Sequence, residues 1–328
     1  MNLQLEPILE RVRRRAAVYF PELGKEVDLR VIGARRRPYS AIFHIAISDG
    51  RQPKRQLVIK VFPFAADQFR GLEAVWPHFA DQANWKIPRP LDCFDTGPAL
   101  VMEAVPGVPL DRRWPQVVWL GRRLREAEAD CRRAGQWLRF YHDVGGREEV
   151  EVFDIRDKWN GVEESLQGLR ALGFSPGVCS SLLDGLRPLV ERLKGRPWVI
   201  SHVHGGFLVD NVLIHDGAVT SLDFSGNDRN LIEHDIASFL NSLSGLRLTR
   251  RVPWSAVRRL EDAFLEGYFG RRRHDEATIT FLRGIGLADT TLEILGRRPS
   301  PIARMWVQHF FACTVRMLLC GPKFGRQF

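Results

Sequence analysis

The main change in the periodicity of the chain lies close to the segment Pro106-Gly107-Val108-Pro109. Before this segment, short runs of alternating apolar and polar residues are separated by turn residues, a pattern that predicts β-strands. After it, apolar residues mostly recur at helical spacing. The 328 residues are therefore predicted to form two lobes, a small β-rich lobe over 1–105 and a larger helical lobe over 106–328. The fold class is α+β, and a ligand is expected in the cleft between the lobes.

Each region is predicted to contain its own set of elements. In the first lobe the pattern predicts helices over 3–18 and 66–82 and strands over Asp28–Gly33, Ser40–Ser48, Gln56–Phe62 and 99–102. In the second it predicts helices over 116–143, 159–172 and 177–194, then a β-rich hairpin region over 198–224 with strands Trp198–Ser201, Val212–Ile214 and Val219–Phe224. After about residue 232 only helices are expected, with breaks at Pro253, Gly286 and Pro299-Ser300-Pro301.

Composition narrows the class of protein. Hydrophobic residues make up 45% and charged residues 27%, which is typical of a globular domain and argues against a disordered chain. No apolar run approaches the roughly 18 residues of a transmembrane helix, and the first residues lack the pattern of a signal peptide. The five cysteines are scattered and form no CxxC pair. They predict reduced thiols in a cytoplasmic protein and argue against a zinc site.

The chain is basic, with a formal net charge of +9. Such a balance fits nucleic acid, an anionic membrane or an acidic substrate, and it equally fits arginines on solvated helix faces. The basic triplets at 13–15, 35–37 and 271–273 lie far apart, without interleaved aromatic residues or zinc-finger spacing. We therefore expect no specific nucleic-acid partner.

Three features of the first lobe could carry chemistry. Lys60 lies in the apolar strand Leu57-Val58-Ile59-Lys60-Val61-Phe62, where an ammonium at the edge of a core needs an anionic partner such as a phosphate or carboxylate. Glu73 follows on a predicted helix. The apolar segment from Ala99 to Gly107 could offer backbone donors and acceptors to a flat ring. Each feature also has a purely structural interpretation. Lys60 could be a lysine that extends to solvent from a strand edge, Glu73 a solvated helix residue, and the segment from Ala99 to Gly107 a connection between the lobes.

A more specific pattern occupies 200–225. The run Ser201-His202-Val203-His204-Gly205-Gly206 leads to Asn211 and a β-branched strand, and Asp223 follows a second apolar strand across the hairpin turn His215-Asp216-Gly217. This hairpin would put an amide oxygen and a carboxylate side by side. Oxygen ligands of this kind suit Mg²⁺ when phosphates supply its other ligands.

In this order, the features resemble the aminoglycoside phosphotransferase and choline kinase-like family, over essentially the whole chain. The family's signature is approximately His-Gly-Asp-x-x-x-x-Asn, an apolar strand, a hairpin and Ile-Asp-Phe/Trp. The resemblance implies a two-lobed protein kinase-like fold that uses ATP and Mg²⁺. It also implies roles for particular residues: Lys60 on the phosphates, Glu73 orienting Lys60, Glu103 to Val105 at the adenine, and Asn211 and Asp223 on Mg²⁺. Asp235, in Glu233-His234-Asp235-Ile236-Ala237, would support the catalytic loop.

The sequence departs from the family pattern in two places. The nucleotide loop near Ile32–Ile42 has no glycine-rich repeat and reads Arg35-Arg36-Arg37-Pro38-Tyr39-Ser40, where Ser40 and backbone amides could contact phosphate. Gly206 occupies the position of the family's catalytic Asp, which accepts the proton of the substrate hydroxyl. His202, His204 and Asp210 are candidate substitutes, although Asp210 adjoins Asn211 and neighbouring residues of an extended segment point to opposite faces.

These residues leave three functions open. The first is an ATP-dependent phosphotransferase acting on a hydroxyl of a small molecule or saccharide, and the second is a nucleotide-binding pseudokinase or scaffold that Gly206 has left inactive. The third is peripheral membrane contact through the apolar segment Ile302–Cys320, which equally fits a core helix.

Residues 225–328 hold 16 Lys+Arg against 10 Asp+Glu, so a neutral or anionic acceptor, such as a sugar, glycan or lipid-linked saccharide, is expected rather than a polycationic aminoglycoside.

Overall fold

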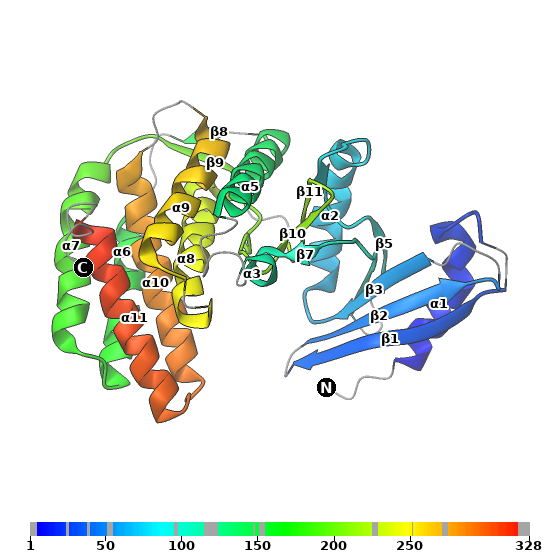
Figure 1. The fold of residues 1–328 in the computed structure, drawn as a ribbon, viewed down its shortest axis with the longest axis horizontal. Coiled ribbons are helices and arrows are strands. Elements are labelled where there is room, and N and C mark those ends of the chain that lie inside the picture. The colour runs from blue at the N-terminus through cyan, green and yellow to red at the C-terminus, as the bar shows by residue number, and fades with distance from the viewer. Residues whose placement is uncertain are drawn as a thin grey trace. The chain divides into compact units, whose positions relative to one another are not determined.

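The chain divides into two compact units in the computed structural model (Figure 1). The structure describes residues 5–23, 26–37, 40–50, 55–94, 98–114, 124–146, 148–150, 155–224, 229–250, 252–270 and 275–320. The first unit comprises Met1–Gly107 and Leu213–Asp228, and the second comprises Val108–Val212 and Arg229–Phe328. The contacts thus group 213–228 with the first unit. The expected division at 105/106, with the whole hairpin in the second lobe, stays a prediction.

A five-stranded sheet forms the centre of the first unit, with the order β1-β2-β3-β6-β5 and antiparallel neighbours. Its strands are β1 (Asp28–Arg37), β2 (Ser40–Ser48), β3 (Arg55–Val61), β5 (Pro90–Phe94) and β6 (Ala99–Glu103). Side chains alternate between its faces, as they do in any strand. Leu57, Ile59 and Val61 of β3 are buried in one cluster with residues of helix α1 (Glu6–Tyr19). The opposite face of β3 carries Lys60, which contacts helix α2 (Ala65–Phe79).

The segment 213–228 adds a small second sheet to the first unit. In it β11 (Ala218–Ser221) pairs in parallel with β4 (Trp85–Lys86), and β10 (Val212–His215) lies on its other side. Asp216 and Gly217 both have positive φ, 47° and 82°, as the two central residues of a tight hairpin turn require. The hairpin turn predicted from His215-Asp216-Gly217 is therefore confirmed.

Helices make up most of the second unit. They are α3 (Leu110–Arg113), α5 (Leu124–Val144), α6 (Ile155–Ala171), α7 (Pro176–Leu193), α8 (Ile232–Arg250), α9 (Trp254–Phe269), α10 (Glu276–Gly296) and α11 (Pro301–Cys320). The short strand β7 (Val108–Pro109) precedes them, and β12 (Arg229–Leu231), β9 (Trp198–His202) and β8 (Glu148–Val150) form a three-stranded sheet in that order. One apolar core joins α6, α7, α10 and α11. A β-rich part and a larger helical part confirm the expected fold class.

Some predicted boundaries are wrong for identifiable reasons. Strand β1 continues four residues beyond Gly33 because a bulge after Val31 resets its register and pairing with β2 runs on to Arg37. Arg35 and Arg36 thus lie in a strand, while 38–39 lie outside the described residues. Gly286 does not break a helix but lies inside α10, where an added Cβ would come 3.2 Å from Asn241 of α8. The breaks expected at Pro253 and 299–301 are confirmed, since α9 and α11 begin there.

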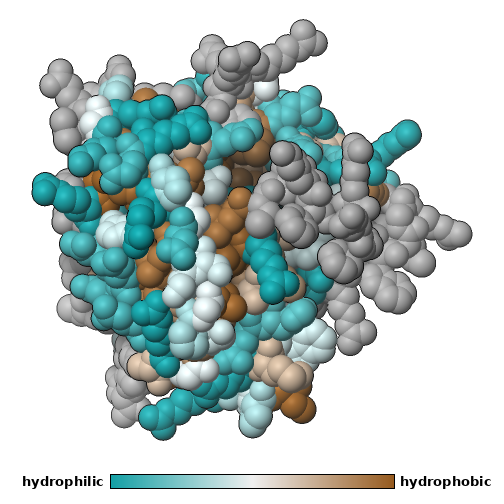
Figure 2. All heavy atoms as spheres, turned by 90° about the vertical axis from the view of Figure 1, so that its left-hand side faces the viewer, coloured by the Kyte–Doolittle hydropathy of each residue, from teal (hydrophilic) through white to brown (hydrophobic). Residues whose placement is uncertain are grey.

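Helix α11 is only partly a core helix. Phe311 and Val315 are buried against the other helices, whereas Ile302, Met305 and Trp306 are exposed. Figure 2 views the second unit from the side of α7 and α11, where hydrophilic residues cover most of the surface and apolar ones show between them. Across the described ranges, each helix is too short or too polar to cross a membrane. Peripheral membrane contact and a cytoplasmic location stay predictions.

Candidate functional site

Lys60 and Asp223 meet in the first unit although 163 residues separate them in the sequence. The Lys60 side chain, 14% exposed, leaves β3 on the α2 side and forms an ion pair with Oδ1 of Asp223. Asp223 follows β11, has a φ of 67° and is 43% exposed. Asp is among the few residues with side chains that tolerate this left-handed conformation. The ammonium also lies 4.3 Å from the centre of the Phe62 ring.

Gln68 of α2 completes this cluster, and the sequence analysis did not single it out. Its Oε1 accepts a hydrogen bond from Lys60 Nζ at 3.0 Å, and its Nε2 donates to the carbonyl oxygen of Phe224 at 2.6 Å. The residue is only 2% exposed. The sequence did contain a signal: Gln68 shares helical spacing with buried Leu72 and Val75, so a polar side chain lies on the apolar face of α2.

The predicted ion pair between Lys60 and Glu73 is wrong. Glu73 is exposed, and within the described part of the chain the ion pair of Lys60 is made with Asp223. The reason is helical geometry, because each residue turns about 100° around the axis. Glu73 follows the buried Leu72 directly and is therefore turned away from the face that carries Gln68.

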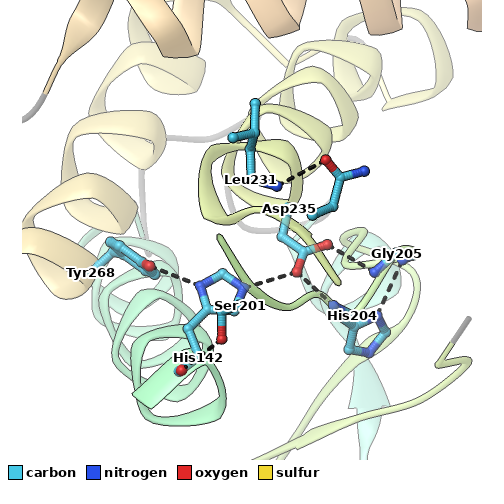
Figure 3. Close-up of polar contacts among 9 residues, drawn as sticks. His142, Ser201, His204, Gly205, Leu231, Asp235 and Tyr268 are labelled. Atoms are coloured by element: carbon cyan, nitrogen blue, oxygen red, sulfur yellow. Dashed lines mark hydrogen bonds and ion pairs between the residues drawn. The ribbon is translucent and has the colours of Figure 1, made fainter. Parts of the chain in front are cut away.

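Asp235 of α8 holds the loop that begins at His204 (Figure 3). Its carboxylate is fully buried and accepts hydrogen bonds from the backbone N–H of His204 at 2.6 Å and of Gly205 at 2.9 Å. His142 Nε2 lies 3.0 Å from the same carboxylate. Burial alone would raise the pKa of Asp235. The hydrogen bonds from His142 and from the backbone N–H of His204, together with electrostatic interaction with both histidines, outweigh burial and lower this pKa below its usual range. The expectation that Asp235 supports the loop is confirmed.

His142 connects this anchor to the surrounding helices, as Figure 3 shows. It lies on α5, and its Nδ1 is 2.8 Å from the hydroxyl of Tyr268 on α9. Its backbone carbonyl accepts a hydrogen bond from Ser201 Oγ on β9 at 2.9 Å. Four elements therefore converge on one buried Asp–His pair, and the pattern of the sequence around 142 had not indicated this.

The loop itself is compact. His204 is fully buried among aromatic rings, with Trp137 and Phe207 against its edges, and its Nδ1 accepts a hydrogen bond from the N–H of Gly206 at 3.2 Å. Asn211 Nδ2 donates to the carbonyl oxygen of Gly206 at 2.9 Å. The burial of His204 fits a role in holding the loop, whereas Asp210 is exposed.

The remaining candidate residues lie at strand ends of the first unit. Ser40 is half-buried at the start of β2, opposite Arg37. The N–H of Glu103 donates to the Arg89 carbonyl at 2.9 Å, and the N–H of Ala104 donates to the Gln56 carbonyl at 3.0 Å. Among the backbone hydrogen bonds of the described residues, none is donated by the N–H of Val105.

Two groups of candidate residues thus form in the two units. Lys60 and Asp223 meet in the first unit, with Gln68 between them, while His204 and Asn211 share one loop of the second unit with Gly206. Within the described ranges, no cluster of three His, Cys, Asp or Glu side chains could hold a metal by itself. The four cysteines whose side chains are described form no disulfide bond.

The sequence matches the model of one protein family. The family is described as the phosphotransferase enzyme family, and the match covers residues 44–277. No curated protein matches the chain.

Several solved structures share the fold. A choline/ethanolamine kinase family protein from Mesorhizobium loti is 14% identical, with a TM-score of 0.59 over 97% of this chain and 96% of its own. Amicoumacin kinase in complex with AMP-PNP, Ca²⁺ and Ami is 15% identical, with a TM-score of 0.54 over 95% and 96%. The ADP-bound aminoglycoside phosphotransferase APH(2'')-Ib is 13% identical, with a TM-score of 0.55 over 95% and 99%. The kinase-like fold is confirmed.

Proposed function

This chain belongs to the phosphotransferase enzyme family, and from that premise we propose that it transfers a phosphoryl group from ATP to a hydroxyl of a small molecule or saccharide, with Mg²⁺. The observation that carries the proposal is the pairing of Lys60 with Asp223. A cation and a carboxylate distant in the sequence meet outside the apolar core, and phosphoryl transfer needs one such charge for phosphate and the other for metal.

The nucleotide would contact residues of the first unit. Lys60, on strand β3, supplies the positive charge for the phosphates. The adenine ring would lie along 103–105, where the N–H of Val105 and the carbonyl of Glu103 offer a donor and an acceptor. Ser40, at the start of β2, would donate its hydroxyl to phosphate.

The residues expected at the metal suit Mg²⁺. Because Nδ2 of Asn211 is engaged with the Gly206 carbonyl, the Asn211 amide oxygen is the atom left for a cation. Asp223 offers a partly exposed carboxylate. One amide oxygen and one carboxylate are too few for a protein-only site and typical of Mg²⁺ held together with phosphates. When bound, the ion would neutralise phosphate charge.

The acceptor hydroxyl would be oriented without the usual Asp. Phosphoryl transfer depends mainly on positioning and charge stabilisation, so Gly206 is compatible with slow transfer. Asp210 is the exposed carboxylate of the loop and the better candidate base. His204 is buried and engaged in the loop, so its proposed part is to hold the backbone at 204–206.

The acceptor class follows from charge. The solved structures with this fold include an aminoglycoside phosphotransferase, amicoumacin kinase and a choline/ethanolamine kinase family protein. The excess of Lys and Arg over 225–328 favours a neutral or anionic acceptor here, because a polycation would be repelled.

Gly206 also favours a second candidate function. A chain that keeps Lys60, Asn211 and Asp223 but lacks the loop carboxylate could bind Mg–ATP without transferring phosphate. Calorimetry with Mg²⁺ and AMP-PNP, followed by an acceptor screen with γ-labelled ATP, separates the two functions. Binding with transfer to a sugar or other hydroxyl compound supports the phosphotransferase, and binding without transfer supports the pseudokinase. If millimolar Mg–ATP does not bind, both proposals fail.

A further inference from the structure

The amide of Gln68 joins the lysine of the site to the backbone beside its carboxylate. It lies on the buried face of α2 and contacts Lys60 of β3 and Phe224, which follows β11. Figure 1 labels the three elements α2, β3 and β11. We propose that Gln68 is a positioning residue that holds Lys60 beside Asp223 for nucleotide binding. Gln68 would thus have the role that the family resemblance gave to Glu73. This inference rests on the proposed function of the site.

The chemistry of the two contacts requires an amide. The Lys60 ammonium has only protons to donate and needs an acceptor, whereas the Phe224 carbonyl needs a donor. An amide supplies both from one side chain, and the two partners fix which end is oxygen and which is nitrogen. A carboxylate at this position would satisfy Lys60 but would place a second acceptor against the carbonyl oxygen, 2.6 Å from the present nitrogen. Gln68→Glu is therefore not a conservative change here.

Because the Gln68 amide is neutral, it does not neutralise the positive charge of Lys60. A helix carboxylate would neutralise the ammonium in every state of the protein, but Gln68 leaves its charge to be shared with Asp223. When phosphate and a cation arrive, Lys60 can exchange the Asp223 carboxylate for phosphate and Asp223 can turn to the cation. Gln68 keeps the lysine in position during that exchange, because its neutral amide can accept from the ammonium whichever anion pairs with the lysine.

The two hydrogen bonds of Gln68 connect three elements of the first unit. β3 carries Lys60, α2 carries Gln68, and Asp223 follows β11 immediately before Phe224. A change at Gln68 should therefore affect ligands with phosphates more than ligands without them. A residue that merely fills space on α2 would affect stability and both kinds of ligand alike.

The test measures dissociation constants for Mg–AMP-PNP and for adenosine by calorimetry, with thermal unfolding alongside. Gln68→Met removes both contacts at similar length, and Gln68→Glu keeps the acceptor but removes the donor. Glu73→Gln is the matched control, since it changes an exposed residue of the same helix. We expect both Gln68 variants to bind Mg–AMP-PNP roughly 10-fold or more weakly, the range for a lost hydrogen bond to a charged group. Adenosine binding should stay within about 2-fold of wild type, as should both affinities of Glu73→Gln.

Each outcome separates this inference from the proposed function. If wild type binds Mg–AMP-PNP and both Gln68 variants bind it equally well, the positioning role is wrong and the proposed function stands. Equal losses for Mg–AMP-PNP and adenosine would show a structural role and also overturn the inference. If Gln68→Met does not fold, Gln68→Glu decides alone. If wild type binds no nucleotide, the proposed function fails and this inference with it.

Discussion

Asn211 reaches back across its own loop, and its Nδ2 donates a hydrogen bond to the backbone carbonyl of Gly206, 2.9 Å away. The backbone N–H of Gly206 meanwhile donates to His204 Nδ1 at 3.2 Å. Both contacts use the main chain of Gly206, and the positive φ of this loop, 73°, belongs to its neighbour Gly205. The loop is therefore shaped by backbone atoms and by Asp235. Gly206 is not among the glycines with positive φ, so its backbone conformation does not require glycine, and substitution at 206 can test catalysis.

Gly206→Asp should raise the rate of phosphoryl transfer. The added carboxylate would stand where the family resemblance places the base, and general-base catalysis is worth about 10²–10⁴-fold. Transfer from labelled ATP to the best acceptor, or basal ATP hydrolysis, gives the rate. Gly206→Asn is the matched control, because it adds a side chain of similar size without a base. Equal rates for the Asp and Asn variants would contradict the assignment of this position.

Asp223→Asn should weaken Mg–nucleotide binding much more than metal-free nucleotide binding. The change removes the charged ligand and releases Lys60, while Asn still tolerates the positive φ of 67°. Calorimetry with AMP-PNP, with and without Mg²⁺, measures the two affinities. Asp216→Asn, at the other Asp with positive φ, in the hairpin turn, should change neither. An unchanged Mg²⁺ dependence in Asp223→Asn would remove Asp223 from the metal site.

Asp235→Asn should destabilise the protein by about 1–3 kcal/mol, because an amide cannot accept from all the buried donors that surround this carboxylate. The folded-state pKa of Asp235 lies below its ordinary value of 3.8. Its ionisation therefore stabilises the fold above that ordinary value, and this stabilisation is lost as the pH falls through the folded pKa.

Urea unfolding at several pH values checks this expectation. The stability difference between wild type and Asp235→Asn should be largest near neutral pH and should shrink in acid. Asp81→Asn, an exposed control, should leave the stability curve unchanged. A difference that is constant down to pH 2 would show that charge at 235 does not matter.

Gly135→Ala should destabilise the second unit. On α5, an added Cβ would collide with the Phe264 carbonyl of α9 and come within 2.8 Å of the backbone N of Tyr268. The two helices must then separate, which costs about 1–3 kcal/mol. Gly161→Ala in α6, where no neighbour lies within 4 Å, should instead stabilise by roughly 0.5–1 kcal/mol. Thermal unfolding of the pair distinguishes close packing from helix propensity, and matching shifts would contradict the packing argument.

Local pattern was enough to predict much of this protein. Alternation identified β2 and β3, helical spacing identified the helices beyond 232, and His215-Asp216-Gly217 identified the hairpin turn. These strands, helices and the turn depend on interactions among neighbours in the chain, and propensity and periodicity report those interactions directly. The role of Asp235 was implied instead by the family resemblance of its motif, since its partners His204 and Gly205 lie 31 and 30 residues earlier.

Only the tertiary structure decided which side chains meet. Periodicity shows that Gln68 shares a helix face with Leu72, but not that Lys60 lies opposite that face, so the choice between Gln68 and Glu73 could not be made from the chain alone. The pairing of Lys60 with Asp223 joins a residue of β3 to one that follows β11, 163 positions later in the sequence. The burial of His204, likewise, depends on aromatic side chains brought by other elements. Sequence spacing determines which face a residue occupies, whereas its partner is set by how distant elements pack.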